Sequence, residues 1–550
     1  MSSAPLFRAC QRTAFLILIT TIFTPRLHGQ AVPFHSSNLP IVFIETGGQE
    51  ILDEPKIPAI MGIIRGSGER NAMGDSCTDY HGPIGIELRG NSSLVYDQKQ
   101  YGLETWNDEG EEENTALMGF PKEHDWVLYA PAADKSLLRN VLVYHMVREM
   151  GRYASRTRFC ELVIDSVYMG VYVFMEKIKR DKNRVVVSKL EPHMEHGEEL
   201  TGGYIFSIDS GGKEGDLGWS GAEDSLGYFT YWHIYPTSKN ITLLQRWHIQ
   251  DHVVRFESVM RGPDVADPHR GYAQWIDVPS FVDYILVNEW ANNVDGFVAS
   301  MYFHKDRASV NRHIVAGPVW DFNIAFGNAN YADGELTSGW RSHYGRVPFW
   351  WRRLLQDPTF TERLEHRWTE LRQGVLSDDH VLHVIDSLAA HLDEAQQRHF
   401  ERWDFLGVFL WPNAFVGETW DEELDYLKSW TLARMAWMDE HIGSIAWTGS
   451  QGGTNRVGDP SVAGDMAIRA YPAPVRDHVT IEMHATSSIS GTLVLCDMLG
   501  RELRRVDVEL QSAGQHFQEF DLRHVPVGIY SVILLGADGS VTSARVTVER

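Results

Sequence analysis

The chain has 550 residues, of which 43% are hydrophobic, 11% aromatic and 23% charged, a composition typical of globular proteins. This length predicts about three to four domains, although a single catalytic domain can be larger. The formal net charge of −24 repels nucleic-acid backbones and anionic lipid surfaces, so we expect no nucleic-acid partner.

The N-terminus carries the pattern of a secretory signal peptide. Its basic start is Arg8 and Arg12, and a short apolar run follows over 14–23. Gly29 then offers a small residue for cleavage. The run is too short to cross ~30 Å of hydrocarbon, and no later stretch reaches the ~18 apolar residues of a spanning helix. We expect residues 1–29 to be removed on export, leaving no transmembrane span; an uncleaved anchor is the alternative.

The cysteines form no metal-binding or redox motif. They are Cys10, Cys77, Cys160 and Cys496. No pair has CxxC spacing, so a zinc ribbon or a thioredoxin-like site has no support in the sequence. A Cys77–Cys160 bridge in an oxidising compartment and separate buried thiols are both open alternatives.

The first polar block follows a predicted strand. Apolar positions alternate over 84–88, and the turn RGNSS begins at Arg89. Lys99 lies on the next strand-like stretch. Backbone N–H groups and cations in such a turn can cradle a phosphate, and a polar surface hairpin is the alternative.

A helix and a hairpin follow. Apolar residues spaced three and four apart predict a helix that Asp134 caps and Gly151 ends, with Arg139 one turn in. A capping salt bridge is the alternative to a functional role for Arg139. Two apolar runs over 161–176 flank a polar turn and predict a hairpin that ends at Glu176, where a surface carboxylate is the alternative.

Two aspartates follow later segments, each at the start of a loop. A capped helix over 280–290 runs into the turn that holds Asp295, and Asp321 comes about twenty-five residues later, after a strand. Phosphoryl transfer needs one carboxylate to deprotonate the acceptor hydroxyl and another to hold Mg²⁺. Asn323 adds an oxygen that suits a hard cation. Turn-forming Asx residues are the alternative interpretation.

The C-terminal part changes character. Residues 449–464 are rich in Gly, Ser, Asn and Pro, which predicts a flexible linker. Beyond them, 465–550 contains short alternating segments separated by turn residues, which predicts a β-sandwich.

The central blocks together resemble the CotH kinase family, over about residues 40–440. The matching motifs, in chain order, are RGNSS with Lys99, DWVLYAP, DKSLLRN, YMGVYVFMEK, TGGYIFSID, NNVDG and PVWDFNIAFGNANY. The resemblance implies a divergent protein kinase that uses ATP and Mg²⁺ or Mn²⁺.

Carried over position by position, the resemblance makes Asp295 the catalytic residue and Asp321, with Asn323, the metal site. It makes Lys99 a phosphate contact. It also places Arg89, Arg139 and Glu176 at family positions that we group with cofactor binding. There is no G-x-G-x-x-G loop before Lys99, and Ser300 stands where conventional protein kinases have an Asn for a second metal. Asn323 stands where some members of the family have a second Asp. The Ser300 and Asn323 departures each leave fewer metal ligands, which predicts one Mg²⁺ rather than two.

The C-terminal region resembles a type IX secretion sorting domain. The matching segments are Tyr471–Pro474, Asp497–Arg501 and Val525–Tyr530. The resemblance implies contact with the type IX secretion machinery and passage through the periplasm to the outer surface or the exterior. An Ig-like accessory module is the alternative.

We therefore expect an α+β protein: a two-lobed, protein-kinase-like domain over 38–448, then a small all-β sandwich over 465–550. The expected function is phosphate transfer from ATP to Ser or Thr of secreted or surface proteins, this chain included. The alternative is a catalytically inactive surface adhesin or structural protein, in which tryptophans such as Trp219 and Trp247 stack on sugars.

Overall fold

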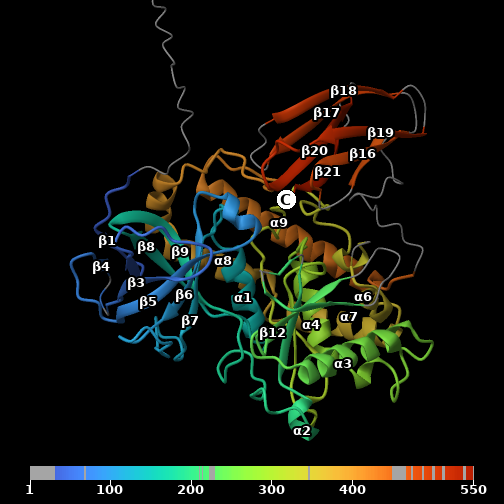
Figure 1. The fold of residues 1–550 in the computed structure, drawn as a ribbon, viewed down its shortest axis with the longest axis horizontal. Helices are drawn as coiled ribbons and strands as arrows, with labels where there is room; N and C mark the ends of the chain where they lie inside the picture. The colour runs from blue at the N-terminus through green and yellow to red at the C-terminus, as the bar shows by residue number, and fades with distance from the viewer. Residues whose placement is uncertain are drawn as a thin grey trace, which may run out of the picture.

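The computed structural model describes two stretches of the chain, residues 31–448 and 466–548. Short gaps fall at 67, 69, 210, 213–214, 222–228, 345–346, 472–474, 486–488, 498–501, 511–513 and 537–540. The predicted signal peptide and linker lie outside the described residues. The described part is mixed α+β, as expected (Figure 1).

The first half of the central region is a closed barrel. Its strand order is β2 (Ile41–Glu45), β3 (Ile57–Ile64), β5 (Tyr80–Arg89), β6 (Gln100–Thr105), β7 (Asp125–Tyr129), β9 (Val167–Glu176) and β8 (Thr157–Ile164). Neighbours pair antiparallel except β2 and β8, which are parallel and close the barrel. Its interior holds Trp126 and Phe174, whose ring centroids lie 5.3 Å apart. At Gly85 a Cβ would lie 2.1 Å from the ring of Trp106, so that ring fits only against a glycine.

Smaller elements accompany the barrel. They are β1 (Ser36–Ser37), β4 (Asn71–Ala72) and the 3₁₀ turn η1 (Ser92–Val95). The predicted hairpin is present as β8 and β9, joined through Asp165 and Ser166, which both have positive φ (46° and 67°).

The predicted helix is α1 (Arg139–Glu149), and it begins five residues after the expected N-cap. The helix starts later than predicted because residues 134–138 form a turn outside it. Asp134 Oδ2 nevertheless accepts the backbone N–H of Arg139, the first helical residue, at 2.8 Å. Asp134 therefore pairs with one of the N–H groups that have no partner inside the helix. Gly151, with φ 87°, follows the C-terminal end as predicted.

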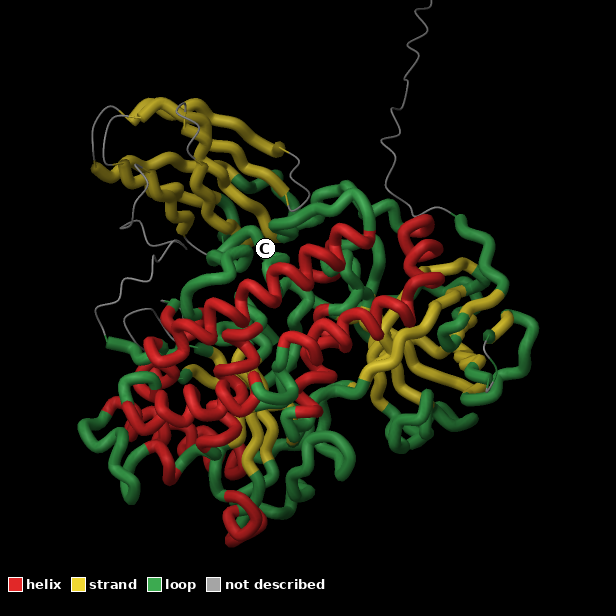
Figure 2. The backbone as a smooth tube through the Cα atoms, turned by 180° about the vertical axis from the view of Figure 1, so that it is seen from behind, coloured by secondary structure: helices red, strands yellow, loops and turns green. Residues whose placement is uncertain are grey.

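The second half of the central region combines a sheet with most of the helices. Figure 2 shows the barrel strands gathered on one side of this region and the helices filling the other. The sheet order is β11 (Gly218–Ser220), β12 (Thr230–Tyr235), β10 (Tyr204–Ile208), β13 (Met301–Lys305) and β14 (Val315–Ala316). The helices are α2 (Gly197–Leu200), α3 (Leu243–Arg261), α4 (Val278–Trp290), α5 (Ala308–Asn311), α6 (Phe349–Leu354), α7 (Pro358–Arg372), α8 (Asp378–Arg402) and α9 (Trp420–His441). Three 3₁₀ turns, η2 (Tyr272–Gln274), η3 (Arg341–His343) and η4 (Ile442–Ser444), complete the described elements.

Helix α8 joins the two halves. It packs on β9 of the barrel and on α9. His399 Nδ1 accepts the backbone N–H of Val171 at 3.1 Å, and Arg398 pairs with the buried Glu161. Since a buried carboxylate needs a charged partner, the Arg398–Glu161 pair fixes the barrel against the helical half.

A second buried ion pair lies at the end of α4. Glu289 and Arg434 are both fully buried and lie 3.1 Å apart. Glu289 also accepts the backbone N–H groups of Arg341 and Ser342, at 2.8 and 2.7 Å. Arg434 donates to the carbonyl of Gly339 at 2.7 Å. The pair therefore ties α4, α9 and the 339–342 segment together.

The C-terminal part consists of two sheets. One has the order β15 (Met466–Tyr471), β16 (His478–Ala485), β19 (Gly514–Asp521), and the other β18 (Glu502–Leu510), β17 (Ile489–Asp497), β20 (Gly528–Gly536), β21 (Val541–Val548). Buried residues of both sheets, such as Ile481 and Leu534, form one hydrophobic cluster, so the sheets pack face to face as predicted.

Two further observations concern the described residues. Cys77 and Cys160 are free thiols, and Cys160 is fully buried, so the separate-thiol alternative holds for this pair. None of the described helices has the length and apolar character needed to cross a membrane.

The Glu289–Arg434 pair gives a stability prediction. Arg434→Ala would leave Glu289 buried beside no cation, so we expect a loss of about 3–5 kcal/mol in the free energy of unfolding. Urea denaturation followed by tryptophan fluorescence measures it. The matched control is Arg270→Ala, which removes an exposed pair with Asp264 and should leave the midpoint unchanged. Equal midpoints for the two variants would contradict the importance of the buried pair.

Candidate active site

Asp295 sits in the turn that follows α4. Its backbone N–H donates to Asn293 Oδ1 at 3.3 Å, and its carbonyl accepts the N–H groups of Val298 and Ala299, both at 2.9 Å. At the next position, Gly296, a Cβ would lie 2.0 Å from the side chain of Asn288. The turn is therefore tight, and glycine is required where it passes α4.

Asp321 is held by three segments. Its φ is 56°, a left-handed conformation that is rare outside glycine. Its N–H donates to Tyr144 Oη of α1 at 3.2 Å, and its carbonyl accepts from Asn293 Nδ2 at 3.0 Å. Its carboxylate Oδ2 accepts from Ser300 Oγ at 3.0 Å. Asn293 thus bonds to the backbones of both aspartates and joins the two turns.

The carboxyl of Asp295 belongs to a partly buried residue and is costly to ionise. Burial is the main cause that raises its pKa to about 6, and the negative charges of Asp321 and Asp209 raise it further. Arg341 and a hydrogen bond from Tyr331 act in the opposite direction.

The carboxyl of Asp321 also has a raised pKa. Burial raises its pKa to about 6, and the negative charge of Asp209 adds to the effect. The hydrogen bond from Ser300 and the positive charge of Arg89 oppose it. Two neighbouring carboxyls that are both costly to ionise form a site that favours a cation.

The barrel contributes Arg89, the last residue of β5. Its guanidinium lies over the ring of Trp320, 5.1 Å from the centroid, and its charge acts on Asp321. Trp320 in turn stacks on Tyr144, with centroids 6.0 Å apart. Arg89 is therefore placed near Asp321.

Lys99 lies across the same loop from Arg89, just before β6. Its ammonium donates to the carbonyl of Leu94 at 2.5 Å, and burial lowers its pKa. In this structure its ammonium therefore bonds to the loop itself.

Arg139 and Glu176 both form ion pairs with neighbouring segments of the fold. Arg139 pairs with Asp134 at 2.6 Å and donates to the carbonyl of Ala325 at 3.0 Å, so it fixes the segment after Asp321. Glu176 pairs with Arg156 at 2.6 Å and accepts the N–H of the same residue. These contacts favour the salt-bridge alternative for Arg139 and a buried ion pair, rather than a surface carboxylate, for Glu176.

The metal residues can be compared with what Mg²⁺ needs. No group of three or more His, Cys, Asp or Glu side chains arranged to hold a metal occurs among the residues that the structure describes. Mg²⁺ is usually held by one or two carboxylates, with waters and substrate phosphates completing the octahedron. Asp321, with partly exposed Asn323 two residues later, fits that smaller donor set.

Two residues near the acid pair were missed by sequence reasoning. Asp209 follows β10 and acts on both Asp295 and Asp321 through its charge. Tyr331 donates a hydrogen bond to Asp295 and stacks on Trp411, with centroids 5.7 Å apart. Asp209 is the last residue of the family motif TGGYIFSID, and Tyr331 is the last residue of PVWDFNIAFGNANY. Their position at the ends of these motifs was the available signal.

The tryptophans of the adhesin alternative are mostly enclosed. Trp340, Trp350 and Trp351 are buried, and Trp219 is partly buried against the core. Trp247 on α3 is 61% exposed. The buried rings cannot stack on a sugar from solvent, which leaves Trp247 as the exposed ring among these five.

Comparison with known proteins gives two family matches. The description "CotH kinase protein" matches residues 86–438, and "Secretion system C-terminal sorting domain" matches residues 469–549. No curated protein matches the chain.

Similarity to solved structures is local. Dimeric latent PorU from Porphyromonas gingivalis has 17% identity and a TM-score of 0.14, over 16% of this chain and 10% of that one. A CARDB domain from Pyrococcus furiosus has 12% identity and a TM-score of 0.13, over 16% of this chain and 88% of that one.

The sorting domain indicates secretion to the cell surface or the exterior. With its family match spanning most of the sequence, the chain belongs to the CotH kinase protein family.

Proposed function

We propose that this protein is an exported, metal-dependent kinase that transfers phosphate from ATP to Ser or Thr hydroxyls of secreted or surface proteins, itself included. The observation that carries the proposal is the pair of desolvated carboxyls, Asp295 and Asp321, each with a pKa of about 6. Such perturbed pairs are concentrated at catalytic sites. The family match supports the reaction class.

The proposed architecture is that of a two-lobed kinase. The barrel is the N-terminal lobe, and the helical half with β10–β14 is the C-terminal lobe. Arg89 approaches Asp321 from the barrel, while Asp295 and Asp321 come from the helical half. A nucleotide between the lobes would thus have a cation on one side and the carboxylates on the other.

Each residue then has a role. Asp295 is ionised at neutral pH and basic enough to accept the proton of the acceptor hydroxyl. Asp321 and Asn323 hold the divalent cation, with Ser300 orienting the Asp321 carboxylate. When bound, Mg²⁺ or Mn²⁺ neutralises charge on the phosphates and fixes their orientation.

Arg89 contacts the phosphates, and Lys99 joins it by leaving the Leu94 carbonyl. The cofactor-binding roles of Arg139 and Glu176 stay predictions, and their ion pairs support the site from outside it. The limited donor set supports one Mg²⁺ rather than two. Because ATP is scarce outside the cell, the kinase acts before secretion or uses another phosphate donor.

A phosphotransfer assay tests the proposal. The mature chain would be incubated with labelled ATP and Mg²⁺ or Mn²⁺, beside Asp295→Ala and Asp321→Ala. We expect label in protein from the parent and a loss of about 10²–10⁴-fold with Asp295→Ala, because a general base contributes that much. Asp404→Ala, an exposed aspartate, is the control and should retain activity. No label, together with no thermal stabilisation by ATP and Mg²⁺, would favour the adhesin alternative.

The acid pair also predicts a pH effect on stability. A carboxyl whose pKa rises to about 6 on folding stabilises the fold at low pH, and this contribution disappears as the pH rises through 6. Asp295→Asn does not titrate. Its free energy of unfolding, relative to the parent, should therefore increase by about 1–3 kcal/mol between pH 4 and pH 7 in metal-free buffer. Chemical denaturation at both pH values measures this, and parallel pH curves for the two proteins would contradict the desolvated state.

A further inference from the structure

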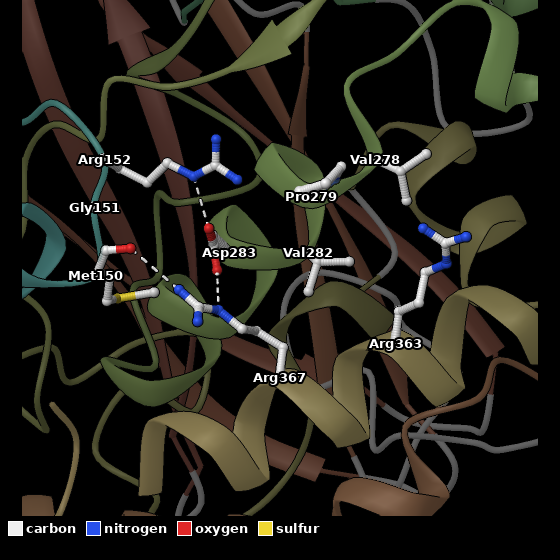
Figure 3. A pocket seen from close by; sticks show the side chains of 9 residues that line it. All are labelled: Met150, Gly151, Arg152, Val278, Pro279, Val282, Asp283, Arg363 and Arg367. Atoms are coloured by element: carbon white, nitrogen blue, oxygen red, sulfur yellow. Dashed lines mark hydrogen bonds and ion pairs between the residues drawn. The ribbon is translucent and has the colours of Figure 1, made fainter. Parts of the chain in front are cut away.

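A cavity of about 350 Å³ lies away from the acid pair, where the end of α1 meets α4 and α7 (Figure 3). Met150 and Arg152 come from the α1 end, Val278 and Val282 from α4, and Arg363 and Arg367 from α7. Neither Asp295 nor Asp321 lines it. Its size is within the range of small-molecule sites, roughly 300–1,000 Å³.

The cavity combines apolar and cationic walls. Met150, Val278 and Val282 supply apolar surface and are themselves buried. Three arginines and one aspartate are the charged lining residues, which leaves a net charge of +2 (3 − 1). Asp277 and Glu370, just outside the lining, pair with Arg152 and Arg367 and offset this charge, which leaves Arg363 as the lining cation without a carboxylate partner among the described residues.

Two of the arginines are fixed by the aspartate. Arg152 Nε lies 2.7 Å from one oxygen of Asp283, and Arg367 Nε lies 2.8 Å from the other. Arg367 also donates to the carbonyl of Met150 at 3.1 Å. Both oxygens of the buried Asp283 therefore already accept from an arginine, and its single negative charge does not neutralise a third cation.

Arg363 is that third cation. It precedes Arg367 by one helical turn, so both side chains leave the same face of α7. No hydrogen bond or ion pair of Arg363 is found within the described residues, and Figure 3 shows its guanidinium beside Val278 with no partner drawn. The neighbouring acidic residues Asp277 and Glu370 pair with Arg152 and Arg367 instead.

A second cavity of about 240 Å³ adjoins the first. The two share Met150, Gly151, Arg152 and Asp283. The second is lined largely by uncharged residues, among them Tyr284 and Val319. It offers room for an apolar chain whose charged end remains in the first cavity.

We propose that this pair of cavities binds a small organic anion, a carboxylate on an apolar chain, with its head on Arg363 and its chain on the apolar walls. Guanidinium groups bind carboxylates through two parallel hydrogen bonds, which the unpaired Arg363 can supply. An alkyl chain that fills the cavity would pack against Met150, Val278 and Val282, which line it. A phosphate ion has no chain to fill this space.

Isothermal titration calorimetry with octanoate tests the proposal on the full mature protein. We expect saturable binding to the parent and a loss of affinity of about tenfold or more with Arg363→Gln, because a charge-assisted hydrogen bond is removed. Arg363 is exposed, so the variant should fold, and its thermal midpoint checks this. The matched control is Arg312→Gln, an exposed arginine that lines neither cavity.

Two further ligands distinguish the contribution of the charged head from that of the apolar chain. Methyl octanoate lacks the charge and should bind as weakly to the parent as octanoate binds to Arg363→Gln. Acetate lacks the chain and should bind more weakly than octanoate. The proposal is overturned if the parent shows no saturable octanoate binding, or if Arg363→Gln binds it as tightly as the parent does. None of these outcomes depends on kinase activity.

Discussion

The buried carboxylate of Glu289 is the constraint on which the candidate site depends. A fully buried charge is costly unless it is paired and hydrogen-bonded, so the chain must bring donors to it. Arg434 arrives from α9, and two backbone N–H groups arrive from η3. Satisfying this one group therefore fixes three segments that are distant in sequence.

The same network extends to the aspartates. Arg341, whose N–H is bound by Glu289, donates through its guanidinium to Asn292 Oδ1 at 2.8 Å. Asn292 stands three residues before Asp295 and has a φ of 42°. The charge of Arg341 also acts on Asp295 and lowers its pKa. A structural ion pair thus places the turn of Asp295 and tunes its carboxyl, which is how a rigid frame holds a reactive group.

Local signals in the sequence predicted the elements well. The spacing of apolar residues located α1, Gly151 marked its end, and alternation located the β8–β9 hairpin. The motif order also selected Asp295 and Asp321, which the structure brings together. Asp209, Tyr331 and the partners of Glu176 could not be predicted in this way. They meet through tertiary contacts, and no local periodicity reports which distant residues share a site.

The parallel pairing of β2 with β8 has a consequence for the order in which the chain folds. Ile41 pairs with Glu161, a separation of 120 residues (161 − 41). Such a nonlocal contact forms late, because the intervening chain must first be ordered. Because β2 precedes β8 along the chain, it is synthesised before β8. During that interval β2 is an unpaired edge that can recruit a foreign strand, so rapid completion of the barrel protects the secreted chain from aggregation.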